Sequence, residues 1–408
     1  MRLAYITVSC PFSDGETFII EEMRKVLEAG VDLTIIPLRP ERIPRDSKAK
    51  ELLPLALESR LFSLTVIRMF LKVLFRSPLL ILKLFIIILR RSRNLRILLK
   101  NLTVFPKGVY IGDILKKRNI EHIHVHWAST PTTVAWIASK ISGIPFSFTA
   151  HRWDIGENNL LSIKCEDADF VRVISLDGKN EILRITGRKD LEGKLKVLYM
   201  GVEIPPHLDK EKENRPFTIA CPANFVEKKG HKYFLNSIKN LNQNGKNFIC
   251  YLIGDGPLKE EIEDFISKNN LKEKAILTGR LPHSEVMGLF RKGEIDLVVL
   301  PSIETSQGEK EGIPVVLMEA MAHCIPVVST PTGGIPELIT QDTGILVPQK
   351  DEDALQKAIT DLINNVELRN KLGKEGRRRV EELFNLNSNV RKLLSYIEKS
   401  IRVKKNTT

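Results

Sequence analysis

Two glutamates on either side of a Gly-Ile-Pro turn form the stretch of the sequence that most clearly indicates chemistry. Glu311 stands directly before Gly312, Ile313 and Pro314, and Glu319 follows in a segment whose pattern predicts a short helix. A carboxylate at Glu319 can accept two hydroxyl hydrogens, as from the diol of a ribose. Two glutamates at this spacing are by themselves more typical of a solvated helix face, so the neighbouring residues decide the interpretation.

The turn between the glutamates predicts that a helix begins at Pro314. Proline suits the first helical position because its missing N–H has no partner there and its φ is already helical. The next amides, those of Val315, Val316 and Leu317, would then be unpaired donors at the positive end of the helix. Such an end binds phosphate groups, so the stretch predicts a site for a sugar nucleotide.

Further motifs follow the two glutamates in a fixed order. Ala320-Met321-Ala322 continues the helix with small residues, a β-branched strand runs from Ile325 to Ser329, and Gly333-Gly334 forms a turn. This order resembles that of the retaining glycosyltransferases of family 4, which have the two-domain GT-B fold. The resemblance covers nearly the whole chain, is weakest over residues 40–105, and is nearest to the exopolysaccharide and colanic-acid-type enzymes.

The composition fits a globular chain with an anionic partner. With 408 residues, of which 43% are hydrophobic and 27% charged, the chain is long enough for two domains with complete cores. Its net charge of +12 indicates a nucleic acid, an acidic membrane surface or a phosphorylated substrate. Five cysteines without CxxC spacing argue against a disulfide framework or a zinc ribbon. No signal peptide is evident, so we expect a cytoplasmic protein.

Residues 3–37 have the strand, turn, helix and strand order of a doubly wound domain. The turn, SDGETF, lacks the GxGxxG fingerprint of nicotinamide-binding proteins. It resembles the S-E-T-F turn of exopolysaccharide-type enzymes, with Gly15 inserted before Glu16, and this resemblance places Gly15 at the donor site. An ordinary turn between a strand and a helix is the alternative.

Residues 61–102 combine long apolar runs with basic residues only. No run reaches the roughly 18 uncharged residues that a membrane-spanning helix needs. Two helices separated by Pro78 would suit the surface of an anionic leaflet, at its cytoplasmic side, with basic side chains reaching the lipid phosphates. Packing of the same helices on the core of the amino-terminal domain is the alternative, and the two can hold for different faces. The basic residues are Arg68, Lys72, Arg76, Lys83, Arg90, Arg91, Arg93, Arg96 and Lys100.

Three histidines alternate along a predicted strand, so His122, His124 and His126 share one face. The HxHxH pattern suggests a metal site. However, two-residue spacing in a strand rarely brings three imidazoles to one ion, and no carboxylate–histidine cluster follows downstream. We therefore expect no metal here, with His126 at the end of the strand as a candidate to line the ligand crevice.

His151 stands at the carboxyl end of the next predicted strand, where an open sheet delivers residues to its ligand crevice. Together with Thr149 and Asp154 it matches a T-x-H-x-x-D motif of family 4. The resemblance implies that His151 contacts the donor sugar near the reacting carbon, and a structural histidine is the alternative. Asp167-Ala168-Asp169 has the spacing of a metal-binding DxD, but in GT-B proteins such a run before a strand is a structural turn.

A polar segment with prolines over residues 203–216 predicts a domain boundary. We expect a Rossmann-like acceptor-binding domain over 1–205, a Rossmann-like nucleotide-sugar-binding domain over 206–385, and a crossover helix with a tail over 386–408. The predicted fold class is α/β, with two doubly wound GT-B domains that face a cleft. The resemblance implies that the carboxyl-terminal helices cross back to the first domain. Residues 355–383 and 390–401 predict one helix each, and residues 403–408 a frayed end.

The loop from Asn224 to Gly230 resembles the family's G-R-L-V-x-x-K-G loop, in which an arginine and a lysine hold the donor diphosphate. Lys229 matches the lysine, whereas Asn224 stands at the arginine position. An amide donates hydrogen bonds but carries no charge, so either phosphate binding is weaker or another cation compensates. Arg280 and Leu281 match the place where backbone groups contact the nucleobase, which leaves the base unreadable from the sequence.

The resemblance implies a metal-independent enzyme that transfers a hexose, with retention, from a UDP- or GDP-sugar to a glycan or lipid-linked acceptor in cell-surface polysaccharide synthesis. The implied catalytic residues are Glu311, at the donor sugar hydroxyls, and His151. No cofactor is expected, because electrostatic stabilisation of the leaving diphosphate suffices for this chemistry.

Two other functions remain open on the sequence. A GT-B protein weakened by Asn224 would serve as a binding or regulatory protein, and a sugar-nucleotide epimerase shares the fold. A phosphorylase would need a pyridoxal lysine that the sequence does not reveal. Nucleic acid is not an expected partner, because the positive charge concentrates in the apolar residues 61–102 rather than in a patch interleaved with aromatic residues.

Overall fold

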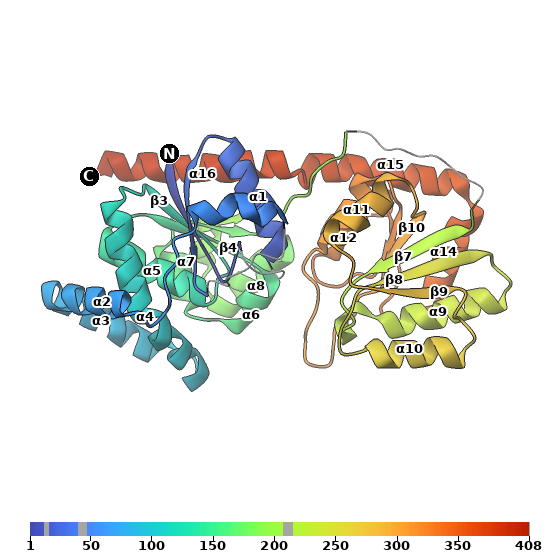
Figure 1. Cartoon of the computed structure of the whole chain (residues 1–408), viewed down its shortest axis with the longest axis horizontal. Helices are drawn as coiled ribbons and strands as arrows, with labels where there is room; N and C mark the ends of the chain where they lie inside the picture. Colours follow the sequence, from blue (N-terminus) through green and yellow to red (C-terminus); the bar gives the residue numbers. More distant parts are fainter. Residues whose placement is uncertain (12–15, 40–46, 207–214, 408) are drawn as a thin grey trace. The chain divides into compact units, whose positions relative to one another are not determined.

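The computed structural model describes residues 1–11, 16–39, 47–206 and 215–407. The chain forms two compact units, residues 1–199 together with the segment from residue 387 onward, and residues 200–386. Each unit has a parallel sheet and a hydrophobic core of its own (Figure 1).

The first unit is built on a six-stranded parallel sheet of order β2-β1-β3-β4-β5-β6. Its strands are short and largely buried, as expected for a parallel sheet that helices cover on both faces. The strands are β1 (Arg2–Thr7), β2 (Asp32–Pro37), β3 (His122–His126), β4 (Phe146–Ala150), β5 (Phe170–Val173) and β6 (Leu195–Val197). The predicted opening of strand, helix and strand is therefore confirmed.

Helices and short 3₁₀ turns connect these strands. They are α1 (Thr17–Glu28), η2 (Ser47–Leu55), α2 (Leu64–Arg76), α3 (Pro78–Arg91), α4 (Leu95–Lys117), α5 (Thr130–Ser142), α6 (Arg152–Glu157), α7 (Leu161–Asp167), α8 (Leu176–Thr186) and η3 (Lys189–Lys194). As predicted, Pro78 separates two helices, and it is the first residue of α3.

The helices α2 and α3 lie outside the layer that covers the sheet. Helix α5 packs on the sheet, α4 packs on α5, and α2 and α3 pack on α4. Two glycines let α4 approach α5 closely, because a Cβ on Gly108 would lie 2.9 Å from the Ile137 side chain, and one on Gly112 would lie 2.8 Å from the Ala138 carbonyl. None of the helices in the described ranges is both long and apolar enough to span a bilayer.

The second unit has another six-stranded parallel sheet, of order β12-β11-β10-β7-β8-β9. Its strands are β7 (Phe217–Pro222), β8 (Phe248–Ile253), β9 (Ala275–Gly279), β10 (Leu297–Leu300), β11 (Val327–Ser329) and β12 (Ile345–Leu346). Its helices are η4 (Glu227–Lys229), α9 (His231–Gln243), α10 (Lys259–Lys268), α11 (His283–Arg291), α12 (Val315–Ala322), α13 (Ile335–Leu338), α14 (Glu352–Asn364) and α15 (Val366–Leu383).

The carboxyl-terminal segment differs from the prediction in two respects. The single helix expected over 355–383 is two helices, α14 and α15, because Asn365 caps the second by accepting a hydrogen bond from the Leu368 N–H at 2.9 Å. The last helix, α16 (Leu386–Thr407), is longer than predicted, and residues 403–406 are helical rather than frayed. Lys405 anchors this end by donating to Glu121 at 2.8 Å.

Helix α16 returns to the first unit and packs against it, as the resemblance implied. The Ser400 hydroxyl lies 3.2 Å from Nδ1 of His122 on β3. The ring of Tyr396 packs on Phe170 of β5, with the ring centroids 5.6 Å apart. The chain therefore crosses between the two units twice, at residues 199–200 and 386–387.

Candidate active site

The topological switch point of the second unit lies between β7 and β10. Strands β8 and β9 follow on one side of β7, whereas β10, β11 and β12 lie on the other side. Doubly wound sheets bind their ligands outside the carboxyl ends of the strands at such a point. The loop after β7 carries Asn224 and Lys229, and the loop after β10 carries Glu311. These three predicted residues thus come from the two loops of the switch point.

A glycine brings these two loops into contact. Gly230 has a φ of +72°, and a Cβ at this position would lie 1.9 Å from the carbonyl oxygen of Pro301. Beside it, the Ile303 N–H donates to the carbonyl of Lys228 at 2.8 Å. A residue without a side chain is required at Gly230, because the backbones approach too closely for any other. This contact fixes the position of Lys229.

Lys229 and Glu311 form an ion pair across the two loops. Their Nζ and Oε1 atoms are 2.8 Å apart, and the two side chains are 17% and 9% exposed. The pair lacks the alignment of a hydrogen bond, so Oε1 of Glu311 keeps its capacity to accept one. The structure therefore brings together the cation and the carboxylate that the sequence had assigned to the diphosphate and to the sugar.

The turn at Gly333 supports Glu311 from behind. With φ at +55°, a Cβ on Gly333 would lie 1.9 Å from the carbonyl oxygen of Glu311. The Gly334 N–H donates to the carbonyl of Gly312 at 3.1 Å. The Gly-Gly turn thus holds the backbone that leads into α12, which gives a physical reason for its place after the two glutamates.

Helix α12 begins one residue later than the sequence predicted. Pro314 is the N-cap, with an extended ψ of 124°, and the helix starts at Val315. Leu317 was expected to offer an unpaired amide, but its N–H donates to the Pro314 carbonyl at 3.2 Å, which closes a tight first turn. The amides of Val315 and Val316 are the first two of the helix, where no intrahelical acceptor exists. They keep the role of candidate phosphate donors at the positive helix end.

Glu319 has a partner that the sequence reasoning missed. Its Oε1 atom lies 2.6 Å from Nε2 of His283, the first residue of α11. The Glu319 side chain is largely buried, whereas that of His283 is half exposed. Arg280 and Leu281 precede His283 in the loop after β9, so this contact joins the predicted base-binding loop to the predicted ribose-binding carboxylate. The only signal in the sequence was a histidine shortly after a strand end.

The other predicted donor residues differ in their exposure to solvent. The side chains of Asn224 and Arg280 are exposed, and that of Leu281 is half-buried. Gly312 and Ile313 are half-buried in the turn that leads to α12. Gly15, the donor residue assigned to the first unit, lies outside the described residues.

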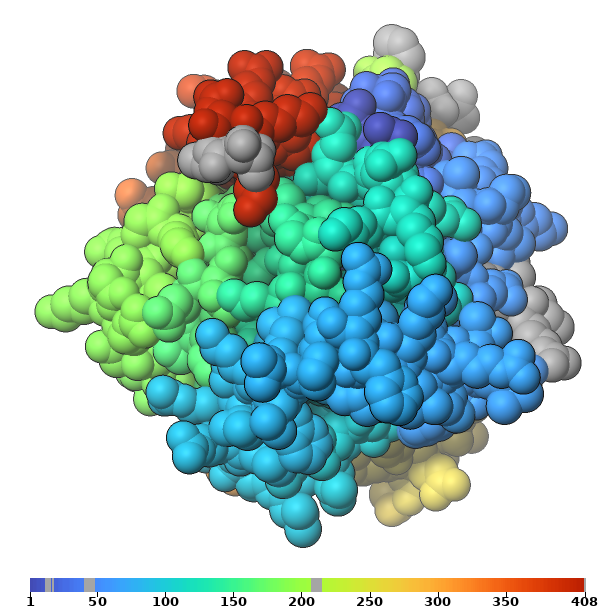
Figure 2. Space-filling view, turned by 90° about the vertical axis from the view of Figure 1, so that its left-hand side faces the viewer, coloured from blue at the N-terminus to red at the C-terminus, as the bar shows by residue number. Residues whose placement is uncertain are grey.

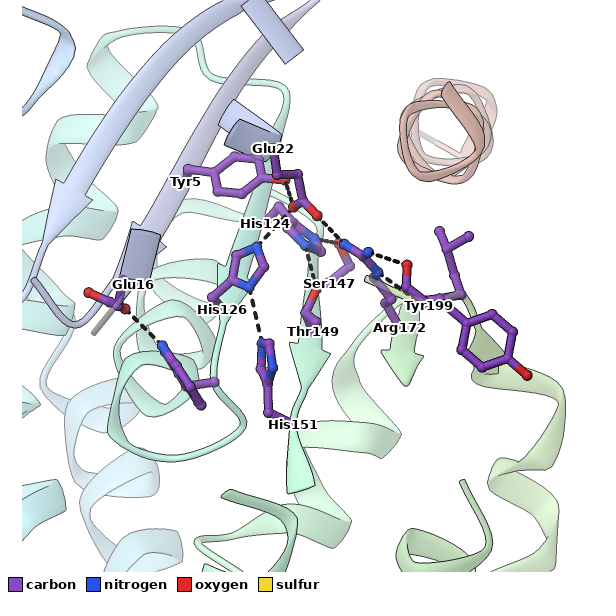
Figure 3. A network of polar contacts seen from close by, with 12 residues as sticks. Tyr5, Glu16, Glu22, His124, His126, Ser147, Thr149, His151, Arg172 and Tyr199 are labelled. Atoms are coloured by element: carbon purple, nitrogen blue, oxygen red, sulfur yellow. Dashed lines mark hydrogen bonds and ion pairs between the residues drawn. The ribbon is translucent and has the colours of Figure 1, made fainter. Parts of the chain in front are cut away.

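The switch point of the first unit lies between β1 and β3, because β2 follows on one side of β1 and β3 lies on the other. Glu16 organises this point (Figure 3). Its carboxylate accepts from the N–H groups of Ser9 and Cys10, both at 2.6 Å, and from Nε1 of Trp127 at 2.8 Å. The buried carboxylate of the S-E-T-F-like turn therefore ties the loop after β1 to the loop after β3, which is a structural role.

His151 is the N-cap of α6, and neighbouring side chains fix its ring. The Asp154 carboxylate accepts from its N–H at 2.8 Å, so the predicted T-x-H-x-x-D motif is a helix start. The indole of Trp127, whose φ is +77°, lies against the imidazole with the ring centroids 4.3 Å apart. Positive φ is rare for so large a residue and marks a constrained position. Burial, together with the nearby charge of Arg172, lowers the pKa of His151 well below its usual range.

His126 connects His151 to a buried ion pair that the sequence did not reveal. Its Nδ1 atom is 3.2 Å from Nε2 of His151, and its Nε2 atom is 2.9 Å from Oε1 of Glu22 (Figure 3). Glu22 is also paired with Arg172 of β5. Burial would raise the pKa of Glu22, but Arg172 and His126 hold it well below its usual range.

Among the described residues, one group has metal-ligand geometry, namely Glu22, His124 and His126. Glu22, which lies upstream of the histidines, is not among the residues predicted from the sequence. The atoms of this group are already engaged. His124 bonds to the hydroxyls of Ser147 at 2.8 Å and Thr149 at 3.0 Å, while the Glu22 carboxylate contacts a guanidinium. A cation would have to displace these partners beside a positive charge, so the donor set does not favour a metal.

The DxD-like run has separate structural partners. Asp167 accepts from Nε1 of Trp136 at 2.6 Å and pairs with Lys140. Asp169 accepts from the hydroxyl of Ser400 on α16. The carboxylates of Asp167 and Asp169 therefore bind two different helices, α5 and α16. This agrees with the prediction that the run has a structural role.

Solved structures share this architecture over almost the whole chain. A glycosyltransferase from Rickettsia africae matches with a TM-score of 0.73 and 21% identity, covering 98% of both chains. Anabaena HepE in complex with UDP also matches with a TM-score of 0.73, at 14% identity, covering 98% of this chain and 100% of that one. Two doubly wound units with a carboxyl-terminal helix that returns to the first unit, shared with these enzymes, define the GT-B fold.

Sequence comparison gives the family. Residues 206–379 match the family described as glycosyl transferases group 1. The glycosyltransferase MJ1178 of Methanocaldococcus jannaschii is 30% identical over 273 residues, which are 65% of this chain and 72% of that one. The amylovoran biosynthesis glycosyltransferase AmsK of Erwinia amylovora is 27% identical over 378 residues, 87% of this chain and 89% of that one. The chain belongs to the group 1 glycosyl transferases.

Proposed function

We propose that the protein transfers a hexose, with retention of anomeric configuration, from a nucleoside diphosphate sugar to a glycan or lipid-linked acceptor in cell-surface polysaccharide synthesis. The observation that carries this proposal is the cluster at the switch point of the second unit, where the Lys229–Glu311 pair adjoins the start of α12. HepE has been solved with UDP and with UDP-glucose, and AmsK is named for amylovoran biosynthesis. HepE supports a nucleotide-sugar donor, and AmsK supports a polysaccharide product; within that class we propose a UDP- or GDP-hexose.

The donor contacts follow from the chemistry of each group. The amides of Val315 and Val316 and the ammonium of Lys229 bind the diphosphate, because both supply positive charge with directed N–H donors. Glu311 accepts from hydroxyls of the sugar, and Glu319 accepts from those of the ribose. The backbone at Arg280 and Leu281 contacts the base.

His151, from the first unit, contacts the sugar near the reacting carbon. The chemical step requires that charge developing on the leaving diphosphate be stabilised. Lys229 and the start of α12 supply that stabilisation without a metal ion, and the leaving phosphate takes the proton of the acceptor hydroxyl. No cofactor takes part.

The first unit offers a surface for a lipid-linked acceptor and its membrane. One face of α2 and α3 packs on the core through Val66, Val73, Ile81, Leu84 and Ile88. The opposite face, which we call the α2–α4 face, exposes large apolar side chains among the exposed basic residues. The segment of α2 and α3 lies on the side that faces the viewer in Figure 2. Its apolar members are Phe62, Leu64, Ile67, Leu71, Phe75, Leu79, Leu82, Phe85, Ile86, Leu89, Leu95 and Leu99.

Such a face suits the inner, anionic leaflet of a membrane. An apolar groove of about 400 Å³ opens between α2, α3 and α4, lined by side chains that include Phe70, Phe85 and Phe105. Apolar side chains enter the acyl region while arginine and lysine bind the phosphates, so both surface chemistries contribute. A peripheral protein at the cytoplasmic side of the membrane would meet a lipid-linked acceptor there.

Asn224 favours a second candidate function, a binding or regulatory protein with weakened catalysis. The family's arginine is absent at this exposed position, so the charge that drives departure of the diphosphate is smaller. A screen of UDP- and GDP-sugars by thermal shift, followed by transfer and hydrolysis assays with the stabilising donor, separates the two. Donor binding without transfer or hydrolysis supports the regulatory function. A changed sugar nucleotide formed without an acceptor would indicate an epimerase.

A further inference from the structure

A buried chain of polar contacts joins His151 to the point where the polypeptide leaves the first unit (Figure 3). It passes from His151 to His126, from His126 to Glu22, and from Glu22 to Arg172. The guanidinium of Arg172 then donates to the carbonyls of Leu198 at 2.9 Å and Tyr199 at 2.8 Å. The path joins the start of α6, where His151 lies, to β3, α1 and β5.

The burial of this path calls for an explanation beyond stability. His126 is 0% exposed, Glu22 and Arg172 are each 1% exposed, and His151 is 6% exposed. Removing an ion pair from water costs about as much as the attraction returns, and apolar residues of similar volume often stabilise a fold more. Tyr5 completes the set by donating to Oε1 of Glu22 at 2.7 Å. A fully satisfied network of this kind holds its members in one arrangement.

When both imidazoles are neutral, the hydrogen bonds leave the two histidines one arrangement of protons. Arg172 and Tyr5 are donors to Glu22, so the carboxylate is an acceptor only, and Nε2 of neutral His126 donates its proton to it. Nδ1 of His126 is then an acceptor, and Nε2 of His151 has to carry the proton that lies between the two rings. Glu22 therefore determines the tautomer of His151 through His126.

The far end of the path holds the backbone that leads to the second unit. The carbonyl of Tyr199 accepts from Arg172 and also, at 3.1 Å, from Nδ2 of Asn389 on α16. Residues 199–200 and 386–387 are the two crossing points of the chain. The network thus contacts both segments that connect the units, at Tyr199 where the chain leaves the first unit and at Asn389 where it has returned.

We propose that Glu22, His126 and Arg172 are positioning residues for sugar transfer, which hold His151 in its Nε2-protonated tautomer and anchor it to the backbone at Leu198 and Tyr199. This inference rests on the proposed function, in which His151 contacts the donor sugar. The network acts through His151 and touches no substrate itself. It restricts His151 to one orientation and one pattern of donor and acceptor toward the sugar, which is the condition for a preorganised site.

Glu22→Gln tests the network because it should exchange donor and acceptor in the hydrogen bonds from residue 22 to His126 and from His126 to His151. Arg172 has only donors, so the amide oxygen of the new side chain must face it, and the amide NH₂ must face Nε2 of His126. His126 then protonates at Nδ1 and donates to His151, whose own proton moves to Nδ1. The tautomer is read from the ¹⁵N shifts of histidine-labelled protein, with the signals assigned from His126→Asn and His151→Asn variants.

His124→Gln is the matched control. His124 lies on the same strand, is equally buried, and bonds to Ser147 and Thr149 instead of Glu22 or His151. We expect Glu22→Gln to switch the His151 tautomer. It should also lower kcat by about ten- to a hundredfold, the loss typical of residues that orient a group at a site without contacting the substrate. The donor KM should stay nearly constant. His124→Gln should leave the tautomer of His151 unchanged and kcat within about twofold of the wild type.

A second variant covers a failure of Glu22→Gln to fold. His126→Gln keeps the Glu22–Arg172 pair and reaches Glu22 as Nε2 does, but it loses the contact with His151. We then expect both tautomers of His151 to be populated and the same fall in kcat. An unchanged His151 tautomer in either folded variant, or an equal loss of kcat in His124→Gln, would overturn the proposal. If the wild type transfers no sugar from any donor, the proposed function fails, while the ¹⁵N measurement still decides the role of Glu22.

Discussion

The Nζ atom of Lys229 lies 2.8 Å from Oε1 of Glu311, so two residues from loops on either side of the switch point form one polar unit. Each neutralises the other in a largely buried position. A diphosphate at the start of α12 would compete with Glu311 for the ammonium of Lys229. Binding of the donor would then free the glutamate to accept from the sugar, which links the two halves of the substrate.

Lys229→Ala should weaken donor binding by about ten- to a hundredfold, because a charged hydrogen bond contributes roughly 1.5–3 kcal/mol. Calorimetry with UDP and GDP measures the effect. Lys228→Ala is the control, since Lys228 joins the loops through its carbonyl rather than through its side chain. Equal losses in the two variants would indicate a general effect of charge and would contradict the specific role of Lys229.

Glu319→Ala should lower the affinity for the donor severely, because two ribose hydroxyls lose their acceptor. His283→Ala provides the comparison, since it removes the partner of Glu319 but keeps the carboxylate. We expect a smaller loss for His283→Ala. Donor affinity that is unchanged by Glu319→Ala in calorimetry would refute the ribose assignment.

Treatment with a chelator such as EDTA should leave turnover intact. The positive charges proposed to stabilise the leaving group belong to Lys229 and to the start of α12, and a chelator removes neither. Initial rates before and after dialysis against the chelator provide the measurement. A loss of activity that Mn²⁺ restores would contradict the metal-independent mechanism.

Acid should destabilise both units through buried histidines. Burial lowers the pKa of His122 to about 3, and burial with the charge of Lys229 lowers that of His231 to about 4. The unfolded chain binds a proton on each near pH 6.5. The free energy of unfolding therefore falls as the pH drops from about 6.5 toward these values, by about 1.4 kcal/mol per pH unit for each histidine.

Thermal unfolding between pH 7.5 and pH 4.5 measures this slope. His122→Asn should make it shallower, because the variant has one buried imidazole fewer to protonate. An acid slope that His122→Asn does not alter would rule out His122 as a contributor.

The α2–α4 face should bind vesicles that contain anionic phospholipid. Replacing Arg90 and Arg91 with Gln should weaken binding, because each basic residue near an anionic surface contributes about 1 kcal/mol. Replacing Phe75 and Leu79, which are 83% and 81% exposed, with Ser should also weaken it. Co-sedimentation with anionic and neutral vesicles gives the measurement. The proposed electrostatic contribution to membrane binding would be contradicted if the variant without Arg90 and Arg91 bound neutral vesicles as strongly as the wild type binds anionic vesicles.

The sequence predicted the positions of the candidate residues better than their partners. Strand ends can be recognised in a sequence, and the carboxyl ends of parallel strands meet at one edge, so Lys229, Glu311 and His151 could be placed in advance. Glu22 and Arg172 are 150 positions apart, and His283 and Glu319 are 36 apart. No periodicity relates such residues, because the sheet order brings them together.

The start of α12 is a second case in which the local sequence could not determine the structure in full. Proline is compatible with both the N-cap and the first helical position, and the choice at Pro314 depends on the backbone that Gly333 and Gly334 hold behind it. Local rules therefore located the start of α12 to within one residue. They could not assign Leu317, whose amide closes a tight turn.

The return of α16 to the first unit makes the second unit an insertion within the first. Its two ends are paired, since the Val202 N–H donates to the Phe384 carbonyl at 2.8 Å and the Leu386 N–H donates to the Val202 carbonyl at 3.0 Å. Residues 200–386 therefore begin and end at one place, as in domains that have been grafted into a loop of another protein. Removing the carboxyl-terminal helix would damage the amino-terminal half of the molecule, because Ser400 lies against the buried His122.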